Sequence, residues 1–212
     1  KWFGITDINS LEILLPIHIL WINLVTDSLP ALALAFDPAN SDIMERKPVK
    51  PGKGVFTKGM TWRVIYQGIM IGGLTLAAFI IGIATPEENL PTMVKIDGTL
   101  YGVEEVENLD EALANGAEYV EKQEVKVEIG QTMAFMVLAF SELVHVFNIR
   151  NNKKSVFKTH PFNNKMLLLA IGASAALMLI ILLVPALRHI FSIPILPMGN
   201  LIETILLIIA PL

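Results

Sequence analysis

The sequence predicts an all-α fold, a polytopic bundle of transmembrane helices with one small lobe outside the membrane. Hydrophobic residues make up 53% of the 212 residues and charged residues 17%, and the mean hydropathy is +0.58, which soluble globular domains do not reach. The apolar residues gather into long runs, and the polar segments between them alternate between basic and acidic. We therefore expect an integral, multi-pass membrane protein that contacts the lipid bilayer and binds no nucleic acid.

Five apolar runs are the expected membrane spans, at about residues 11–36, 61–84, 131–147, 166–187 and 199–212. The first is roughly 39 Å long as a helix and exceeds the ~30 Å hydrocarbon core. The fourth is apolar throughout apart from Ser174, and Pro185 lies near its end. The fifth is about 21 Å long as a helix, too short to cross the core, so we expect a truncated span.

The charges of the polar segments predict the orientation of the spans. The segments 37–60 and 148–165 are basic, whereas the segment 85–130 is strongly acidic. Because loop Lys and Arg mark the cytoplasmic side, we expect two cytoplasmic loops and an acidic lobe on the opposite side. The acids of the lobe could attract cations, although a run of charge is usually a solvated surface.

Local patterns within the lobe predict a small ordered structure. We expect a hairpin around Asp97-Gly98, a short capped helix that ends at Gly116, and a further strand within residues 118–128. In the second span, Gly68, Gly72 and Gly73 would let a neighbouring helix approach closely, and packing is the role that we expect for them.

Three of the polar residues in the first span are candidate cation ligands. Asn23, Thr26 and Asp27 are spaced i, i+3 and i+4, so on an α-helix their side chains share one face and offer oxygen ligands. An ionised Asp27 near mid-bilayer costs on the order of 2.5 to 3.5 kcal/mol, so it should face the bundle interior, with a cation, a proton or a basic partner. This pattern is typical of a site for a hard cation.

Pro30 predicts a break in the same helix. Proline has no N–H to give to the carbonyl of Thr26, and its ring disfavours helical geometry at Leu29. Transporters build ion sites at such breaks, where the opened backbone lines a cavity. The alternative is that Asn23 and Thr26 are interhelical hydrogen-bond partners and that the proline is ordinary, because proline is common in membrane helices.

Glu142, in the third span, is the second acid expected near the middle of the membrane. Asp27 and Glu142 together would supply two charges and up to four oxygens, and with Asn23 and Thr26 they suit Ca²⁺, which takes six to eight oxygen ligands. Mg²⁺ would keep its waters, and softer metals would require Cys or His. Because burial disfavours the charged form, the acids should take up protons when the cation leaves, which predicts proton counter-transport. The alternative is a protonated structural Glu142.

Two histidines lie in the spans. His145 follows Glu142 at i+3 and could pair with that acid, but for His145 we favour packing or a structural hydrogen bond, because no second nitrogen ligand stands beside it.

Three stretches carry a resemblance to a known family: LWINLVTDSLPALAL at 20–34, DIMERKP at 42–48 and FSELVHVFNIRN at 140–151. The chain resembles the C-terminal membrane region of a P-type cation-transporting ATPase, of the calcium-pump branch that includes reticulum and bacterial pumps. The resemblance implies the sixth to tenth transmembrane helices.

By this resemblance, four residues match calcium ligands: Asn23, Thr26 and Asp27 of the sixth helix, and Glu142 of the eighth. The loop with DIMERKP would face the phosphorylation domain. Ser28 stands where the reticulum pumps have glycine, and the acidic lobe also differs from theirs.

The resemblance implies part of a Ca²⁺ site in an ATP-driven, alternating-access pump, in the plasma membrane if the source is bacterial. ATP and Mg²⁺ would bind to parent domains outside this chain, and the partners would be those domains and the first to fifth helices. We find no phosphate loop, nucleophile elbow or zinc motif, so the chain alone should be inactive.

Three alternatives remain open at this point. A pump of the same architecture could move Mn²⁺ or another divalent cation, because oxygen ligands do not exclude it. A secondary cation/proton exchanger also breaks its spans at a mid-membrane acid. A non-catalytic membrane scaffold would hold Asp27 as a structural residue.

Overall fold

The computed structural model describes residues 12–36, 44, 58–149 and 164–211. The expected cytoplasmic loops, 37–60 and 148–165, lie mostly outside these residues, as does the DIMERKP motif except for Met44.

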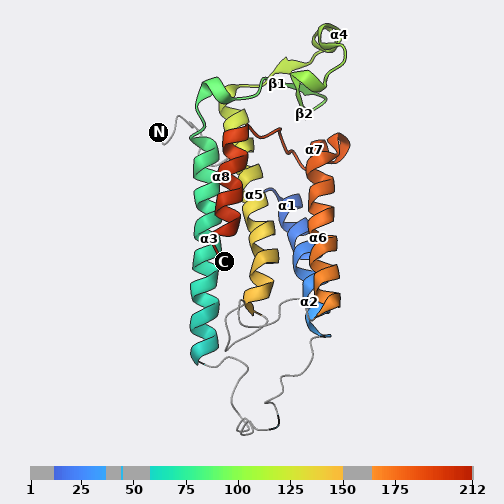
Figure 1. Cartoon of the computed structure of the whole chain (residues 1–212). Helices are drawn as coiled ribbons and strands as arrows, with labels where there is room; N and C mark the ends of the chain where they lie inside the picture. Colours follow the sequence, from blue (N-terminus) through green and yellow to red (C-terminus); the bar gives the residue numbers. More distant parts are fainter. Residues whose placement is uncertain (1–11, 37–43, 45–57, 150–163, 212) are drawn as a thin grey trace.

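Four helical segments are long and apolar enough to cross a membrane, which confirms the predicted all-α bundle (Figure 1). The first, Pro16–Leu34, is composite and consists of α1 (Pro16–Trp21), a π-helical segment η2 (Ile22–Asp27) and α2 (Ser28–Leu34). The others are α3 (Lys58–Ile83), α5 (Lys122–Ile149) and α6 (Lys165–Leu183), and a shorter apolar helix, α8 (Met198–Ile209), follows them.

Helix α5 is the centre of the bundle. It lies between α3 and α8 on one side and the first span and α6 on the other (Figure 1), and it contacts all four. Its inward residues, which include Ile129, Phe135 and Val137, are fully buried. The apolar core is therefore built around the span that carries Glu142.

Helices α3 and α5 approach each other closely at a pair of glycines. A Cβ atom added to Gly82 would lie 2.4 Å from the Cα of Gly130, so both positions require glycine. The prediction for Gly68, Gly72 and Gly73 is wrong for the described residues, because a Cβ at any of them would meet nothing within 4 Å. Glycine spacing alone does not reveal which face of a helix meets its neighbour.

Several helix boundaries differ from those of the expected spans. Helix α5 begins at Lys122 rather than at 131, because Val125 and Ile129 pack into a core shared with the lobe and so extend the helix beyond the apolar run. Helix α6 ends at Leu183 rather than at 187, because Pro185 begins a separate short helix, α7 (Pro185–Ile190). The first span also begins later, at Pro16 instead of 11.

The lobe contains a three-stranded antiparallel sheet in the order β2-β1-β3, formed by β1 (Met93–Ile96), β2 (Thr99–Gly102) and β3 (Glu118–Tyr119). The predicted hairpin is confirmed, because Asp97 and Gly98 both adopt positive φ, 49° and 81°, between β1 and β2. The predicted strand at 118–128 is confined to β3, and the rest belongs to α5 apart from a short connection.

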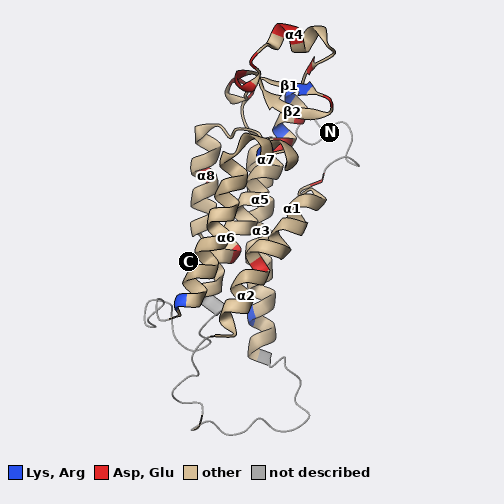
Figure 2. Ribbon diagram, turned by 90° about the vertical axis from the view of Figure 1, so that its right-hand side faces the viewer, with Lys and Arg blue, Asp and Glu red and all other residues tan. Residues whose placement is uncertain are grey.

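The predicted short helix of the lobe is confirmed as α4 (Leu109–Ala114), which ends just before Gly116 at φ 100°. Two short 3₁₀ turns, Glu87–Asn89 and Val103–Glu105, complete the lobe. Figure 2 shows acidic residues gathered there, whereas the helical bundle is almost uncharged.

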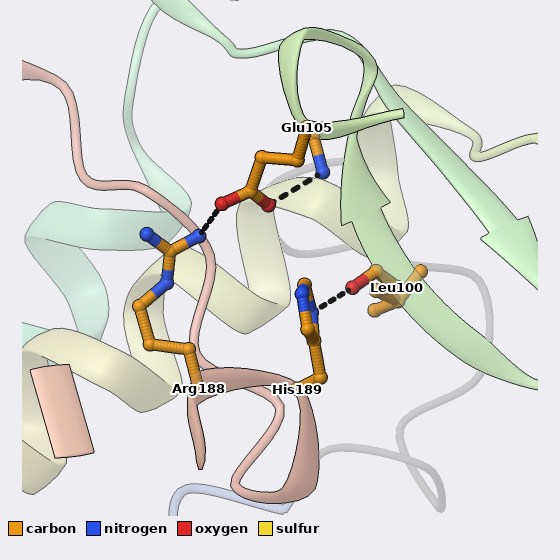
Figure 3. A network of polar contacts seen from close by, with 5 residues as sticks. Leu100, Glu105, Arg188 and His189 are labelled. Carbon is orange, nitrogen blue, oxygen red and sulfur yellow. Dashed lines mark hydrogen bonds and ion pairs between the residues drawn. The ribbon is translucent and has the colours of Figure 1, made fainter. Parts of the chain in front are cut away.

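A polar network attaches the lobe to α7 (Figure 3). A nitrogen of the Arg188 guanidinium lies 2.6 Å from a carboxylate oxygen of Glu105, and both side chains are mostly buried. The neighbouring His189 Nδ1 lies 2.9 Å from the backbone oxygen of Leu100. These contacts join α7 to the lobe and fix the position of the lobe on the helical bundle.

Candidate cation site

The first span changes its helical register where the polar residues lie. Residues 22–27 form a π-helix, which confirms that the helix is loosened next to Pro30, although it is not unwound. Two hydroxyl groups donate to carbonyls of this segment: Thr26 Oγ1 to Ile22 O at 2.8 Å, and Ser28 Oγ to Asn23 O at 2.8 Å. Single-turn π segments occur frequently at functional sites.

Thr26 and Asp27 meet Glu142 of α5 at this break. Thr26 Oγ1 lies 3.1 Å from Glu142 Oε2, and the Asp27 and Glu142 carboxyl groups are within hydrogen-bonding reach of each other. Thr26 has only one hydroxyl proton, so it can donate to Ile22 O or to Glu142 but not fully to both. Two adjacent carboxyl groups repel each other when both are ionised, and a cation or a proton between them removes that repulsion.

The site is open on one side. Thr26 is buried and Glu142 half-buried, whereas Asp27 is exposed within the described chain. Among the described residues there is no group of three or more His, Cys, Asp or Glu that could hold a metal ion. Two carboxylates and one hydroxyl provide up to five oxygens, fewer than the six to eight that Ca²⁺ takes, so these residues can form only part of a Ca²⁺ site.

Asn23 does not join the other three predicted ligands in this structure. Its side chain is exposed and borders a shallow surface pocket with Ile19 and Leu20. The expectation of one shared face assumed α-helical spacing, and the π-helical hydrogen bonds, which reach one residue further, change the rotation of Asn23 relative to Thr26 and Asp27. Asn23 stays a predicted ligand.

The two histidines of the spans play packing roles. His18 is fully buried, stacks on Phe135 at a centroid distance of 4.4 Å, and has its Nε2 at 2.7 Å from Phe191 O in a hydrogen bond. His145 is also buried, and neither ring nitrogen has a hydrogen-bond partner within the described part of the chain. The structure therefore shows no pairing of His145 with Glu142.

Side chains from other helices hold the backbone of the broken span, and the sequence reasoning missed them. Each donates to a carbonyl oxygen of the first span or of the residues just before it: Ser174 Oγ to Val25 O at 2.7 Å, Asn164 Nδ2 to Ala33 O at 3.2 Å, and Gln131 Nε2 to Glu12 O at 2.7 Å. The only sequence signal was the isolated polar Ser174 in an apolar span. Such contacts link residues more than a hundred positions apart, beyond the reach of local patterns.

Comparison with known proteins identifies the family. A family model described as "Cation transporting ATPase, C-terminus" matches residues 11–212. The Calcium-transporting ATPase 1 of Bacillus cereus (strain ATCC 10987 / NRS 248) is 37% identical over 203 residues, which cover 93% of this chain and 20% of that protein. The Calcium-transporting ATPase of Bacillus subtilis (strain 168) is 36% identical over 178 residues, 84% of this chain and 16% of that protein.

A plant protein gives a more distant match. The Arabidopsis thaliana protein "Calcium-transporting ATPase 2, endoplasmic reticulum-type" is 27% identical over 205 residues, 86% of this chain and 19% of that protein. The chain thus spans about a fifth or less of the length of these relatives. Together with the apolar helices, the family match shows that this chain belongs to the cation-transporting ATPases and is their C-terminal, multi-pass membrane region.

Proposed function

We propose that this chain is the membrane part of an ATP-driven Ca²⁺ pump and supplies part of the ion-binding site. The observation that carries the proposal is the meeting of Thr26 and Asp27 with Glu142, with 3.1 Å between Thr26 Oγ1 and Glu142 Oε2, at a π-helical break inside the membrane. The names of the bacterial and plant relatives, all calcium-transporting ATPases, support the choice of ion.

The chemistry of the ligands also favours a hard divalent cation. Two carboxylates and a hydroxyl offer only oxygen, and the chain contains no Cys. Ca²⁺ accepts many oxygens in irregular geometry, whereas Mg²⁺ demands a near-octahedral site and retains water. Asn23 and groups from outside this chain would complete the coordination, and the exposed side of Asp27 is where those groups would approach.

The proposed mechanism is alternating access driven by phosphorylation of domains outside this chain, which would bind ATP and Mg²⁺. The first to fifth helices and these domains would be the partners of this chain. Cation binding would neutralise Asp27 and Glu142, and release would leave two adjacent carboxylates in a medium that strongly disfavours them. Protons would then replace the cation, so we propose proton counter-transport.

ATP-driven uptake of ⁴⁵Ca²⁺ tests the proposal, in vesicles that contain the full-length protein. We expect Asp27→Asn to lower uptake at micromolar Ca²⁺ at least tenfold, because the variant loses one of two site charges. The matched control is Asp110→Asn, which removes an exposed acid of the lobe and should leave uptake unchanged. A pH-sensitive dye inside the vesicles should report loss of internal protons as Ca²⁺ enters.

Other outcomes would replace the proposal. Uptake of ⁵⁴Mn²⁺ in preference to ⁴⁵Ca²⁺ would make the protein a pump for another divalent cation. Uptake that needs a pH gradient but no ATP would indicate an exchanger, which family membership already disfavours. Uptake unaffected by Asp27→Asn would return Asp27 to a structural role.

A further inference from the structure

Ser174 is an isolated polar residue in the most apolar helix of the bundle. It lies within α6, whose sequence KMLLLAIGASAALMLIILL contains no other polar side chain after Lys165. Most of α6 faces outward, but Ser174 itself is fully buried. Its Oγ donates to the backbone oxygen of Val25 at 2.7 Å, across 149 residues of sequence.

The carbonyl of Val25 lies in the part of the first span where the helical hydrogen bonds are disturbed. Pro30 has no N–H, so residue 30 can bond neither to Thr26 O, four positions back, nor to Val25 O, five positions back as in a π-helix. Within hydrocarbon an unpaired carbonyl costs several kcal/mol, because no water can replace the lost donor. Ser174 supplies a donor from another helix at this break.

The position of the bond matters for the candidate site. Val25 immediately precedes Thr26 and Asp27, so a bond at its carbonyl restrains the rotation of the backbone that carries both side chains. Helix α6 holds this backbone, while α5 presents Glu142 to Thr26 at 3.1 Å. In Figure 1 α6 runs beside the first span, and η2 contacts both α5 and α6.

We propose that Ser174 is a positioning residue for the cation site: it holds the π-helical segment in the register in which Thr26 and Asp27 meet Glu142. The inference rests on the proposed function of that site. Ser174 does not bind the ion in this account, because its hydroxyl group is buried against Val25 O. The competing explanation is an ordinary interhelical hydrogen bond that contributes only to stability.

The first test compares Ca²⁺ dependence with stability in the full-length protein. Ser174→Ala removes the donor, Ser174→Thr keeps a hydroxyl group, and Thr204→Val is the matched control. Thr204 is equally buried and also bonds a carbonyl at 2.7 Å, that of Asn200, but within its own helix α8. The measurements are the Ca²⁺ concentration for half-maximal ATP-driven uptake, the maximal rate and the thermal midpoint.

We expect Ser174→Ala to raise the half-maximal Ca²⁺ concentration about tenfold, the size of effect that losing one buried hydrogen bond can have. The maximal rate should change less than twofold, and Ser174→Thr should restore most of the affinity. Thr204→Val should shift the thermal midpoint by a similar amount without changing Ca²⁺ affinity. Unchanged affinity in Ser174→Ala, or an equal affinity loss in Thr204→Val, would overturn the proposal.

A second measurement does not depend on Ca²⁺ transport. This chain has no cysteine, so the double substitution Asp27→Cys and Glu142→Cys introduces the only cysteine pair of this chain. A short bifunctional methanethiosulfonate can cross-link the two thiols, and mass spectrometry can map the cross-link. Adding Ser174→Ala should lower the cross-linking yield, and Ser174→Thr should restore it. Equal cross-linking yields with and without Ser174→Ala would refute the positioning role, even if the pump moved another ion. If the yields changed as expected but the full-length protein took up no ⁴⁵Ca²⁺, only the proposed function would be refuted.

Discussion

Helix α5 is joined to α3 and to the first span in different ways. Toward α3 the contact is backbone against backbone, at Gly82 and Gly130, with apolar side chains around it. Toward the first span, the contact includes the polar pair of Thr26 and Glu142, and other helices add side-chain hydrogen bonds to carbonyls of that span. The first joint depends on shape, whereas the second adds polar groups to its apolar packing.

This difference indicates which part of the bundle can respond to an ion. A close-packed apolar contact has no groups whose charge changes, so binding a cation or a proton leaves it as it is. A joint made of carboxyl and hydroxyl groups must rearrange when its charge changes, because each group then gains or loses a partner. We expect α3 and α5 to move as one unit and the first span to move against them.

The largest expected effect comes from breaking the shape-dependent joint. Gly82→Ala would place a Cβ 2.4 Å from the Cα of Gly130, and because backbone cannot yield as a side chain can, we expect a loss of about 3 kcal/mol of stability. Gly72→Ala, in the same helix but with nothing within 4 Å, is the matched control and should be neutral or slightly stabilising. Thermal unfolding of the detergent-solubilised chain measures both, and equal midpoints would contradict the tight contact.

A smaller effect is expected from a hydrogen bond between the first span and the residue that follows α7. A carbonyl can only accept, so His18 Nε2 donates to Phe191 O, and Nδ1 is free to accept from Leu15 N at 3.4 Å. His18→Leu leaves Phe191 O without this donor in a buried place and should cost about 2 kcal/mol. His18→Gln, which can still donate, should recover part of the thermal midpoint. If both variants lost the same stability, the aromatic stacking rather than the hydrogen bond would be the important contact.

The smallest effect is expected from an exposed ion pair between the lobe and the start of α5. A hydrogen bond and ion pair with Lys122 at 3.0 Å, with a further contribution from Lys126, lower the pKa of the exposed Glu87. The pKa of Glu87 is thus lower in the folded than in the unfolded protein, so the ion pair stabilises the fold at pH values above the ordinary pKa of Glu. This stabilisation is lost as the pH falls through the lowered pKa.

Lys122→Met should therefore raise the pKa of Glu87 toward its ordinary value, as measured by ¹³C NMR titration of labelled glutamate side chains. The thermal midpoint at pH 7 should hardly change, because exposed ion pairs contribute little. A titration curve for Glu87 unchanged by the substitution would show that Lys122 does not set its pKa.

Much of the fold could be predicted because the relevant forces act over short distances. Hydropathy located the helices that can cross a membrane, Asp97-Gly98 located the hairpin, and Pro30 located the break. The structure differs from expectation in packing: among the described residues Gly82, rather than Gly72 and its neighbours, meets another helix, and α5 extends beyond the expected span, starting at Lys122. Both depend on which face meets another element, and periodicity does not contain that information.

The sequence by itself determined which segments lie in the bilayer and which polar side chains they carry there, because apolar run length and proline geometry are local properties. Only the tertiary structure decided which of those groups meet: Thr26 with Glu142 across 116 residues, and Ser174 with Val25 across 149. The physical reason is that such contacts depend on the rotation and crossing of whole helices, which are set by packing over the entire bundle.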